Sequence, residues 1–116
     1  EDLTMPSVRV TGNRIVAEAI ARRLITPRGR LVDDPNYGYA LSEFVNDDLG
    51  PGDLARIQAG VQSECVKDER VSTAKATVVL AGAIIVATIV LTTSFGPFTL
   101  VLSVNDVSAS ILQVSP

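Results

Sequence analysis

The side chains that could do acid–base chemistry in this chain are carboxylates, because the sequence contains no histidine. Two carboxyl groups can supply the general acid and the base that cleave a glycosidic bond. The candidates are Glu43, Asp47, Asp48, Glu64 and Asp68. A charged, solvated face explains the same residues, and only two Tyr and three Phe could build an aromatic sugar cleft. We therefore expect no enzymatic activity.

The sequence also offers few residues that could form a metal or nucleotide site. A zinc site would have to combine carboxylates with Cys65, the only cysteine. The spacing of the glycines at positions 29, 38, 50 and 52 fits neither a phosphate-binding loop nor a dinucleotide fingerprint. We expect no cofactor, and we expect Cys65 to be a small core residue of a chain from a reducing compartment.

Arginines offer the remaining chemistry, since Arg22, Arg23, Arg28 and Arg30 could bind phosphates. Aromatic residues do not alternate with them, and the net charge of −3 provides no general attraction to nucleic acid or to an anionic membrane. We therefore favour the interpretation that these arginines are solvated or contact a protein. Neither nucleic acid nor membrane is expected as a partner.

Charge is distributed unevenly along the chain, and this divides it into two parts. After Lys75 the only charged residue is Asp106. The sequence predicts an α+β fold in one domain, residues 1–116, with N-terminal helices at about residues 12–66 packed on a C-terminal antiparallel β-meander at about residues 72–104. The acidic start, EDLTMPSVRV, lacks the apolar core of a secretory signal, so no export is expected.

Two helices must position the charged residues. Apolar residues at helical spacing predict a helix over residues 12–25, capped by Thr11 or Asn13 and ended by Pro27. Its periodic positions are Ile15, Val16, Ala19, Ile20 and Leu24.

A short helical turn is predicted at residues 40–46, and a second main helix at residues 53–66, capped by Asp53. Helical spacing turns Leu54, Ile57, Val61 and Cys65 inward. The same pattern leaves Glu64 and Lys67 outside.

The uncharged C-terminal part is long enough to be considered as a membrane span. Its richness in Val, Ile and Thr favours strands instead, and basic and aromatic anchors are missing from its flanks. We predict strands at residues 72–80, 83–93 and 98–104, with turns at Ala81–Gly82 and Gly96–Pro97. A last short strand through Ile111 and Val114 is also predicted. The uncharged edges of these strands invite pairing with another chain.

One stretch, RRLITPRGRLVDDPNYG at residues 22–38, resembles the signature of the small baseplate wedge proteins of contractile phage tails. These proteins are also called sheath initiators, and relatives occur in type VI secretion and related contractile injection systems. The matching residues are Arg23, Leu24, Thr26, Pro27, Gly29, Leu31, Asp33 to Pro35, Tyr37 and Gly38. A second match is the triplet Asp68, Glu69 and Arg70 before Val71, where the family carries Glu-Pro-Arg; Glu69 stands in place of the proline.

The resemblance covers nearly the whole chain and implies a structural role in the virion tail baseplate, with assembly in the host cytoplasm. It implies that the triplet binds the wedge core, that the C-terminal strands contact the sheath protein and template its first ring, and that six copies encircle the tube. Tube or hub proteins are further partners it allows. On this basis the candidate sheath-contacting residues are Val78, Leu80, Ile84, Val86, Ile89, Leu91, Leu100 and Leu102.

Two alternatives remain open from the sequence. A regulatory protein-binding module of the anti-adaptor type shares the same fold. The arginine-rich loop within residues 22–38 either faces a neighbour in the assembly or is simply an ordered loop that ends the first helix. In the second case Pro27 and Pro35 fix φ, Gly29 and Gly38 permit turns, and Asp33 or Asp34 pairs with Arg28 or Arg30.

Overall fold

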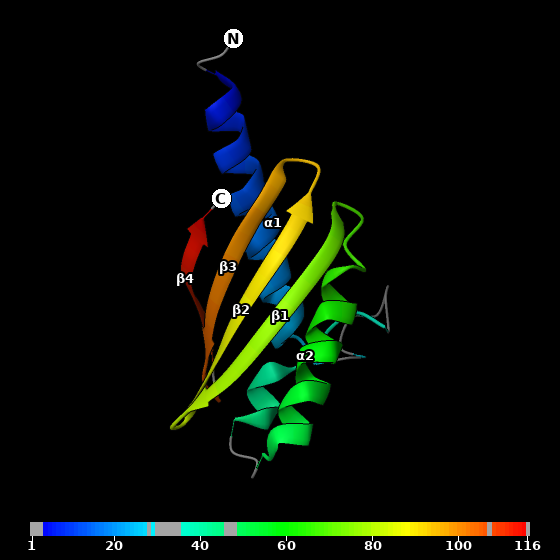
Figure 1. Cartoon of the computed structure of the whole chain (residues 1–116), viewed down its shortest axis with the longest axis vertical. Coiled ribbons are helices and arrows are strands. Elements are labelled where there is room, and N and C mark those ends of the chain that lie inside the picture. The colour runs from blue at the N-terminus through cyan, green and yellow to red at the C-terminus, as the bar shows by residue number, and fades with distance from the viewer. Residues whose placement is uncertain (1–3, 28, 30–35, 46–48, 107, 116) are drawn as a thin grey trace.

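The chain folds as two helices and a short 3-10 helix followed by a four-stranded antiparallel sheet (Figure 1). This computed structural model describes residues 4–27, 29, 36–45, 49–106 and 108–115, with side chains from residue 12 onward. The elements are α1 (Thr4–Ile25), η1 (Leu41–Phe44), α2 (Pro51–Cys65), β1 (Val71–Ala81), β2 (Ile84–Thr93), β3 (Gly96–Val104) and β4 (Ala109–Ser115). The predicted α+β fold, with helices packed on a β-meander, is confirmed.

Helix α1 ends at Ile25, as Pro27 predicts, but it begins at Thr4 rather than at residue 12. In Figure 1 its first turns project past the sheet. Asn13 is therefore not a cap; it lies within the helix and is 6% exposed. The predicted inward position of Ile15 is also wrong, because its side chain is 51% exposed. The buried stripe consists of Val16, Ala17, Ile20 and Leu24.

Helix α2 begins at Pro51, two residues before the predicted start. Gly50 is the N-cap residue, and Asp53 acts from inside the first turn: its carboxylate accepts a 3.0 Å hydrogen bond from the Gly50 N–H. Ile57, Val61 and Cys65 are buried as predicted. The predicted helical turn at residues 40–46 corresponds to η1.

The four strands form a simple meander in the order β1-β2-β3-β4. The first turn is Gly82–Ala83, because Ala81 pairs with Ile84 and Gly82 takes a φ of +63°. The second turn is Ser94–Phe95 rather than Gly96–Pro97, since Gly96 already pairs with Thr93. The Thr93 hydroxyl holds this turn by accepting from the Phe95 N–H and donating to the Gly96 carbonyl, each at 3.0 Å.

The predicted last strand is confirmed as β4, which includes Ile111 and Val114 and extends the β part to Ser115. Leu112 is an extra residue in this strand: Ile111 pairs with Leu102 and Gln113 with Val101. The result is a β-bulge that leaves Leu112 60% exposed on an edge strand.

The core lies between one face of the sheet and the helices. Helix α1 runs behind the sheet in Figure 1 and contacts β3 and β4, whereas α2 lies beside β1. The largest fully buried side chains are Phe98, Ile20, Leu24, Leu41, Ile57, Ile85, Ile89, Leu91, Leu100 and Leu102. Neither helix, over the residues described, is both long and apolar enough to span a membrane.

Candidate functional site

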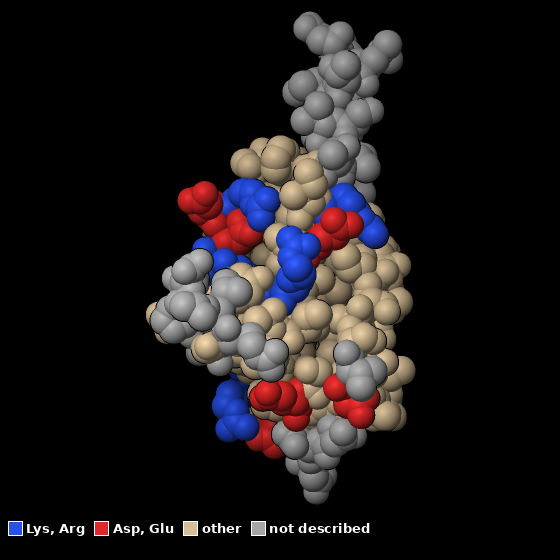
Figure 2. Space-filling model, turned by 180° about the vertical axis from the view of Figure 1, so that it is seen from behind, with Lys and Arg blue, Asp and Glu red and all other residues tan. Residues whose placement is uncertain are grey.

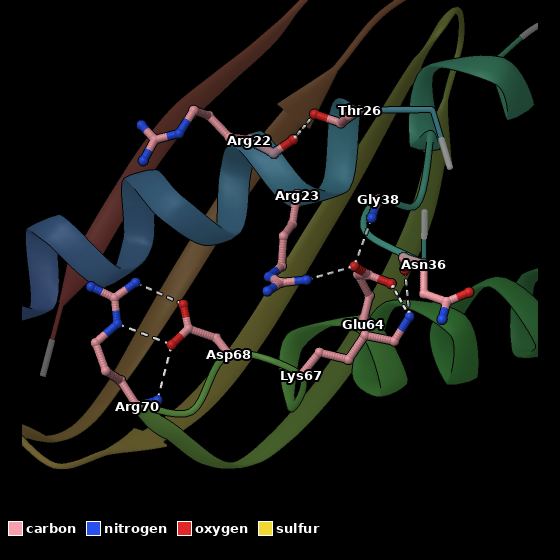
Figure 3. Close-up of polar contacts among 9 residues, drawn as sticks. All are labelled: Arg22, Arg23, Thr26, Asn36, Gly38, Glu64, Lys67, Asp68 and Arg70. Atoms are coloured by element: carbon pink, nitrogen blue, oxygen red, sulfur yellow. Dashed lines mark hydrogen bonds and ion pairs between the residues drawn. The ribbon is translucent and has the colours of Figure 1, made fainter. Parts of the chain in front are cut away.

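A buried carboxylate, Glu64 of α2, joins the end of α1 to the chain that returns after the arginine-rich loop (Figure 3). Its side chain is 0% exposed. Its Oε2 atom accepts hydrogen bonds from Arg23 Nη1 at 2.9 Å and from the Gly38 N–H at 2.8 Å. Lys67 Nζ donates to the other oxygen, Oε1, at 3.0 Å. The carboxylate thus connects three separate segments of the chain.

Placing Glu64 on the outside of α2 was wrong. It lies three residues after Val61 and seven after Ile57, so helical spacing puts it on the buried face. That spacing is the sequence signal that could have revealed it. A carboxylate is buried at such a position only when donors neutralise it. Here all three donors, Arg23, the Gly38 N–H and Lys67, lie outside α2.

The electrostatics of this cluster follow from its contacts. Burial raises the pKa of Glu64, but hydrogen bonds from Gly38, Lys67 and Arg23 outweigh it, so the pKa is lowered. Burial, aided by the neighbouring Glu64 charge, raises the pKa of the Cys65 thiol to about 12. Cys65 is therefore an unreactive core residue, as predicted.

The loop of the family motif, which runs from the end of α1 to Tyr39, is held at both ends by Arg23. The Arg23 carbonyl accepts a 2.9 Å hydrogen bond from the Tyr39 N–H, and its guanidinium lies 4.5 Å from the centroid of the Tyr37 ring. Thr26 Oγ1 donates to the Arg22 carbonyl at 2.6 Å, which closes the last turn of α1. Leu24 is fully buried. Each of these motif residues stabilises the return of the chain.

The two glycines of the motif have positive φ angles, as their predicted turn role requires: +89° at Gly29 and +112° at Gly38. Pro27 lies two residues after Ile25, the last residue of α1. Arg28, Arg30, Leu31 and residues 33–35 lie outside the described residues, and so does the predicted pairing of Asp33 or Asp34 with an arginine.

The triplet at residues 68–70 forms its own charge pair at the junction of α2 and β1. Asp68 Oδ1 accepts from both the backbone N–H and Nε of Arg70, at 2.9 and 3.0 Å, and Oδ2 accepts from Nη2 at 2.7 Å. Asp68 is buried, whereas the Arg70 side chain is 37% exposed. These bonds order the turn although Glu69, rather than proline, stands at its centre.

The pair shifts the titration of both partners. The hydrogen bonds from Arg70 lower the pKa of Asp68 despite its burial, and the Asp68 carboxylate raises the pKa of Arg70. Glu69 is exposed, and its charge also raises the pKa of Arg70, to a smaller extent than Asp68. The carboxylate partner of Arg70 is therefore Asp68 of the same turn.

The two motif regions meet at one surface pocket of about 320 Å³, lined by Arg23, Lys67, Asp68, Glu69 and Arg70. Seen from the side opposite to Figure 1, Lys and Arg side chains lie next to Asp and Glu side chains over the helical face (Figure 2). The pocket lining is polar and carries charges of both signs. It suits a protein surface with its own paired charges better than a single small ion.

The candidate sheath-contacting residues divide between the two faces of the sheet. Val78, Ile89, Leu91, Leu100 and Leu102 are buried against the helices, so their side chains are not at the surface. Leu80 and Val86 are half-buried, and Ile84 is 39% exposed.

On the outer face of the sheet, the side chains available to a partner are those that alternate with the buried residues along each strand. Val79 and Val90 are 53% and 50% exposed. The cross-strand pairs Val79–Val86, Thr77–Thr88 and Val90–Thr99 continue this face across the sheet. Lys75 is the charged residue that the described strands contribute to it.

Of the carboxylates considered for catalysis, the three that the structure describes do not line a common pocket. Glu64 and Asp68 are each engaged by cationic side chains, while Glu43 is exposed on η1. Asp47 and Asp48 lie outside the described residues. Within the part of the chain that the structure describes, no three His, Cys, Asp or Glu side chains gather as a metal-binding group. In comparisons with known proteins, no protein-family model matches the chain, and no curated protein matches its sequence.

Proposed function

We propose that this chain is a structural component of a contractile tail baseplate, which links the wedge core to the sheath and templates the first sheath ring. The proposal rests on the resemblance of residues 23–38 and 68–71 to the baseplate wedge family. In this role the chain acts through protein contacts alone, and six copies surround the tube.

The arrangement of the two motif regions supports the wedge-binding part of this role. The Arg70–Asp68 pair and Arg23 line the same pocket, so both regions present one polar surface beside the helices. A partly exposed arginine that is already oriented by a carboxylate can contact a partner with little loss of side-chain freedom.

The structural observation that best supports the sheath-templating part of this role is the uncharged outer face of the sheet. Apart from Lys75, the outward residues are chiefly Val, Thr and Ser, which face away from the chain's own helices. Such a face binds a partner through shape and apolar contacts, whereas main-chain hydrogen bonds to a partner strand can form only at the edges of the sheet. This is the type of contact expected for a template of repeated protein subunits.

The test is to tag the chain in its producing cells during tail assembly and to identify what copurifies from the soluble fraction by mass spectrometry. Recovery of wedge and sheath proteins together supports the proposal. Recovery of a regulator alone favours the anti-adaptor type of module, and recovery of neither partner contradicts the assembly role.

The variant Arg70→Glu tests the contribution of the triplet. It replaces the paired arginine by a third consecutive acid and should abolish recovery of wedge proteins and of sheath-bearing tails. Arg56→Glu is the matched control, because Arg56 is a 73% exposed arginine that also pairs with an aspartate, Asp53. Circular dichroism of both purified variants must show the native fold. Normal yields of contractile tails with Arg70→Glu would remove the triplet from the proposed interface.

A further inference from the structure

The sheet has two edge strands, β1 and β4, and they differ in what covers them. An edge strand normally presents a row of unpaired N–H and C=O groups, which can accept a strand from another chain. Strands β2 and β3 are paired on both sides, so strand addition can take place only at β1 or β4.

Side chains of α2 already occupy the outer edge of β1. Gln62 Oε1 accepts a 2.9 Å hydrogen bond from the Ala76 N–H, and Gln58 Oε1 accepts a 3.0 Å bond from the Val78 N–H. These are edge donors that an added strand would need. Two glutamines therefore replace the carbonyl groups of a neighbouring strand.

The match between helix and strand follows from their dimensions. Gln58 and Gln62 lie four residues apart on one face of α2, a rise of about 6 Å along the helix axis. Ala76 and Val78 lie two residues apart in β1, a distance of about 6.8 Å in an antiparallel strand. Because these spacings nearly agree, two successive turns of α2 can satisfy two successive outward N–H groups.

The edge formed by β4 has a different character. Its sequence, ASILQVS, carries no charge and no proline, the residues that commonly block edge pairing. Among the described residues, no side chain is seen to cap its backbone as Gln58 and Gln62 cap β1. The bulge places Leu112, 60% exposed, on this edge. The bulge also interrupts the regular ladder, so the edge suits a short segment.

We infer that the sheet accepts a partner strand at β4 alone, and that α2 acts as a cap that keeps the β1 edge closed. The partner at β4 is a short, uncharged, extended segment with an apolar side chain that contacts Leu112. Each chain then binds one such segment. That the segment comes from the sheath rests on the proposed function; closure of β1 is a property of the isolated chain.

The first experiment measures amide hydrogen exchange by NMR in the isolated chain. In the double variant Gln58→Met/Gln62→Met, which keeps side-chain length but removes the acceptors, the Ala76 and Val78 amides should exchange roughly tenfold faster. Glu at both positions retains acceptors and should preserve protection. Ala55→Met/Ala59→Met adds the same side chains on exposed positions of α2 and is the control.

The amides of Ala87 and Ile89 on β2 serve as an internal reference, because their exchange reports opening of the whole sheet. Unchanged exchange at Ala76 and Val78 in the methionine variant, relative to the control, would overturn the cap. Exchange that became faster to the same extent at Ala87 and Ile89 would also overturn the cap, because it would mean that the whole sheet is destabilised.

The second experiment places a lysine on each edge strand and repeats the copurification. Leu112→Lys should remove sheath protein while wedge proteins are retained, and Ser72→Lys, at the exposed position where the register of β1 shifts, should leave both. The reverse pattern would overturn the assignment of the open edge to β4. If the unmodified chain recovers neither partner, the proposed function fails, while the exchange result still decides the closure of β1.

Discussion

The Glu64 carboxylate and the Gly38 N–H, which lie 26 residues apart in the sequence, are joined by a buried 2.8 Å hydrogen bond. The same oxygen accepts from Arg23. The arginine-rich loop is thus held at its start and at its end by one side chain of α2. Residues of the motif that suggested a family by their order therefore have, in this chain, a common structural task.

Removing this carboxylate should be strongly destabilising. Glu64→Ala leaves Arg23 and the Gly38 N–H without their shared acceptor, and loss of one partner of a buried charge pair costs about 3–5 kcal/mol. Urea denaturation measures this as a lower midpoint. Glu18→Ala is the control, since the Arg14–Glu18 pair is about half exposed and should contribute within about 0.5 kcal/mol. Equal effects of the two variants would contradict the central role of Glu64.

Acid should destabilise the chain through Glu64 and Asp68. Both pKa values are lowered in the folded state, from ordinary values of 4.5 and 3.8. Their ionised forms therefore stabilise the fold above those values, and this contribution is lost as the pH falls through the folded pKa values. The urea midpoint should decline below about pH 4.5, and it should depend less on pH in Glu64→Gln. If the urea midpoints of the native chain and of Glu64→Gln depended on pH in the same way, Glu64 would not contribute to the loss of stability in acid.

Gly38→Ala should destabilise the chain for two combined reasons. The φ of +112° disfavours an L side chain, and an added Cβ would overlap the Thr26 carbonyl oxygen. A loss of at least about 2 kcal/mol is expected in thermal or urea unfolding. Gly29→Ala separates the two effects, because Gly29 also has a positive φ but an added Cβ meets nothing within 4 Å. A loss at Gly29 as large as that at Gly38 would mean that the steric contact adds nothing.

The Asp68–Arg70 pair should contribute modestly to stability. A double-mutant cycle with Asp68→Asn and Arg70→Met should give a coupling energy of about 0.5–1 kcal/mol, because solvent reaches the arginine. The measurement is the urea unfolding free energy of the four proteins. A coupling above about 3 kcal/mol would instead indicate a desolvated pair with a structural rather than a surface role.

Asn13 offers a stabilising substitution. It is 6% exposed, and its Oδ1 atom has no hydrogen-bond partner among the described residues. Asn13→Leu removes this unsatisfied acceptor while keeping the branching of the side chain at Cγ, and it should raise stability by about 1 kcal/mol, seen as a higher melting temperature. A clear fall would show that the amide has a donor in the folded chain.

Several features were determined by local sequence. Pro27 ends α1 at Ile25, and the Val, Ile and Thr runs with intervening glycines specify a meander of strands. Helical spacing also identified Ile57, Val61 and Cys65 as core residues. These predictions succeed because a ring-fixed φ, β-branched side chains and helical periodicity act on a few neighbouring residues.

Tertiary structure alone decided which face of each strand is buried. Both alternations of β1 and β2 are largely uncharged, so sequence pattern cannot choose between Val78 and Val79 as the inner residue. Contact with the helices selects the face that carries Ile89, Leu91, Leu100 and Leu102, which buries more apolar surface than the Val and Thr face.

The buried carboxylate and the closed edge were likewise decided in three dimensions. Burying Glu64 is favourable only when Arg23 and the Gly38 N–H, 41 and 26 residues earlier, reach it. The Gln62 and Gln58 side chains become strand substitutes only because α2 lies along β1 at the matching rise. Both depend on partners distant in sequence, whose positions are set by the packing of helices on the sheet rather than by any local pattern.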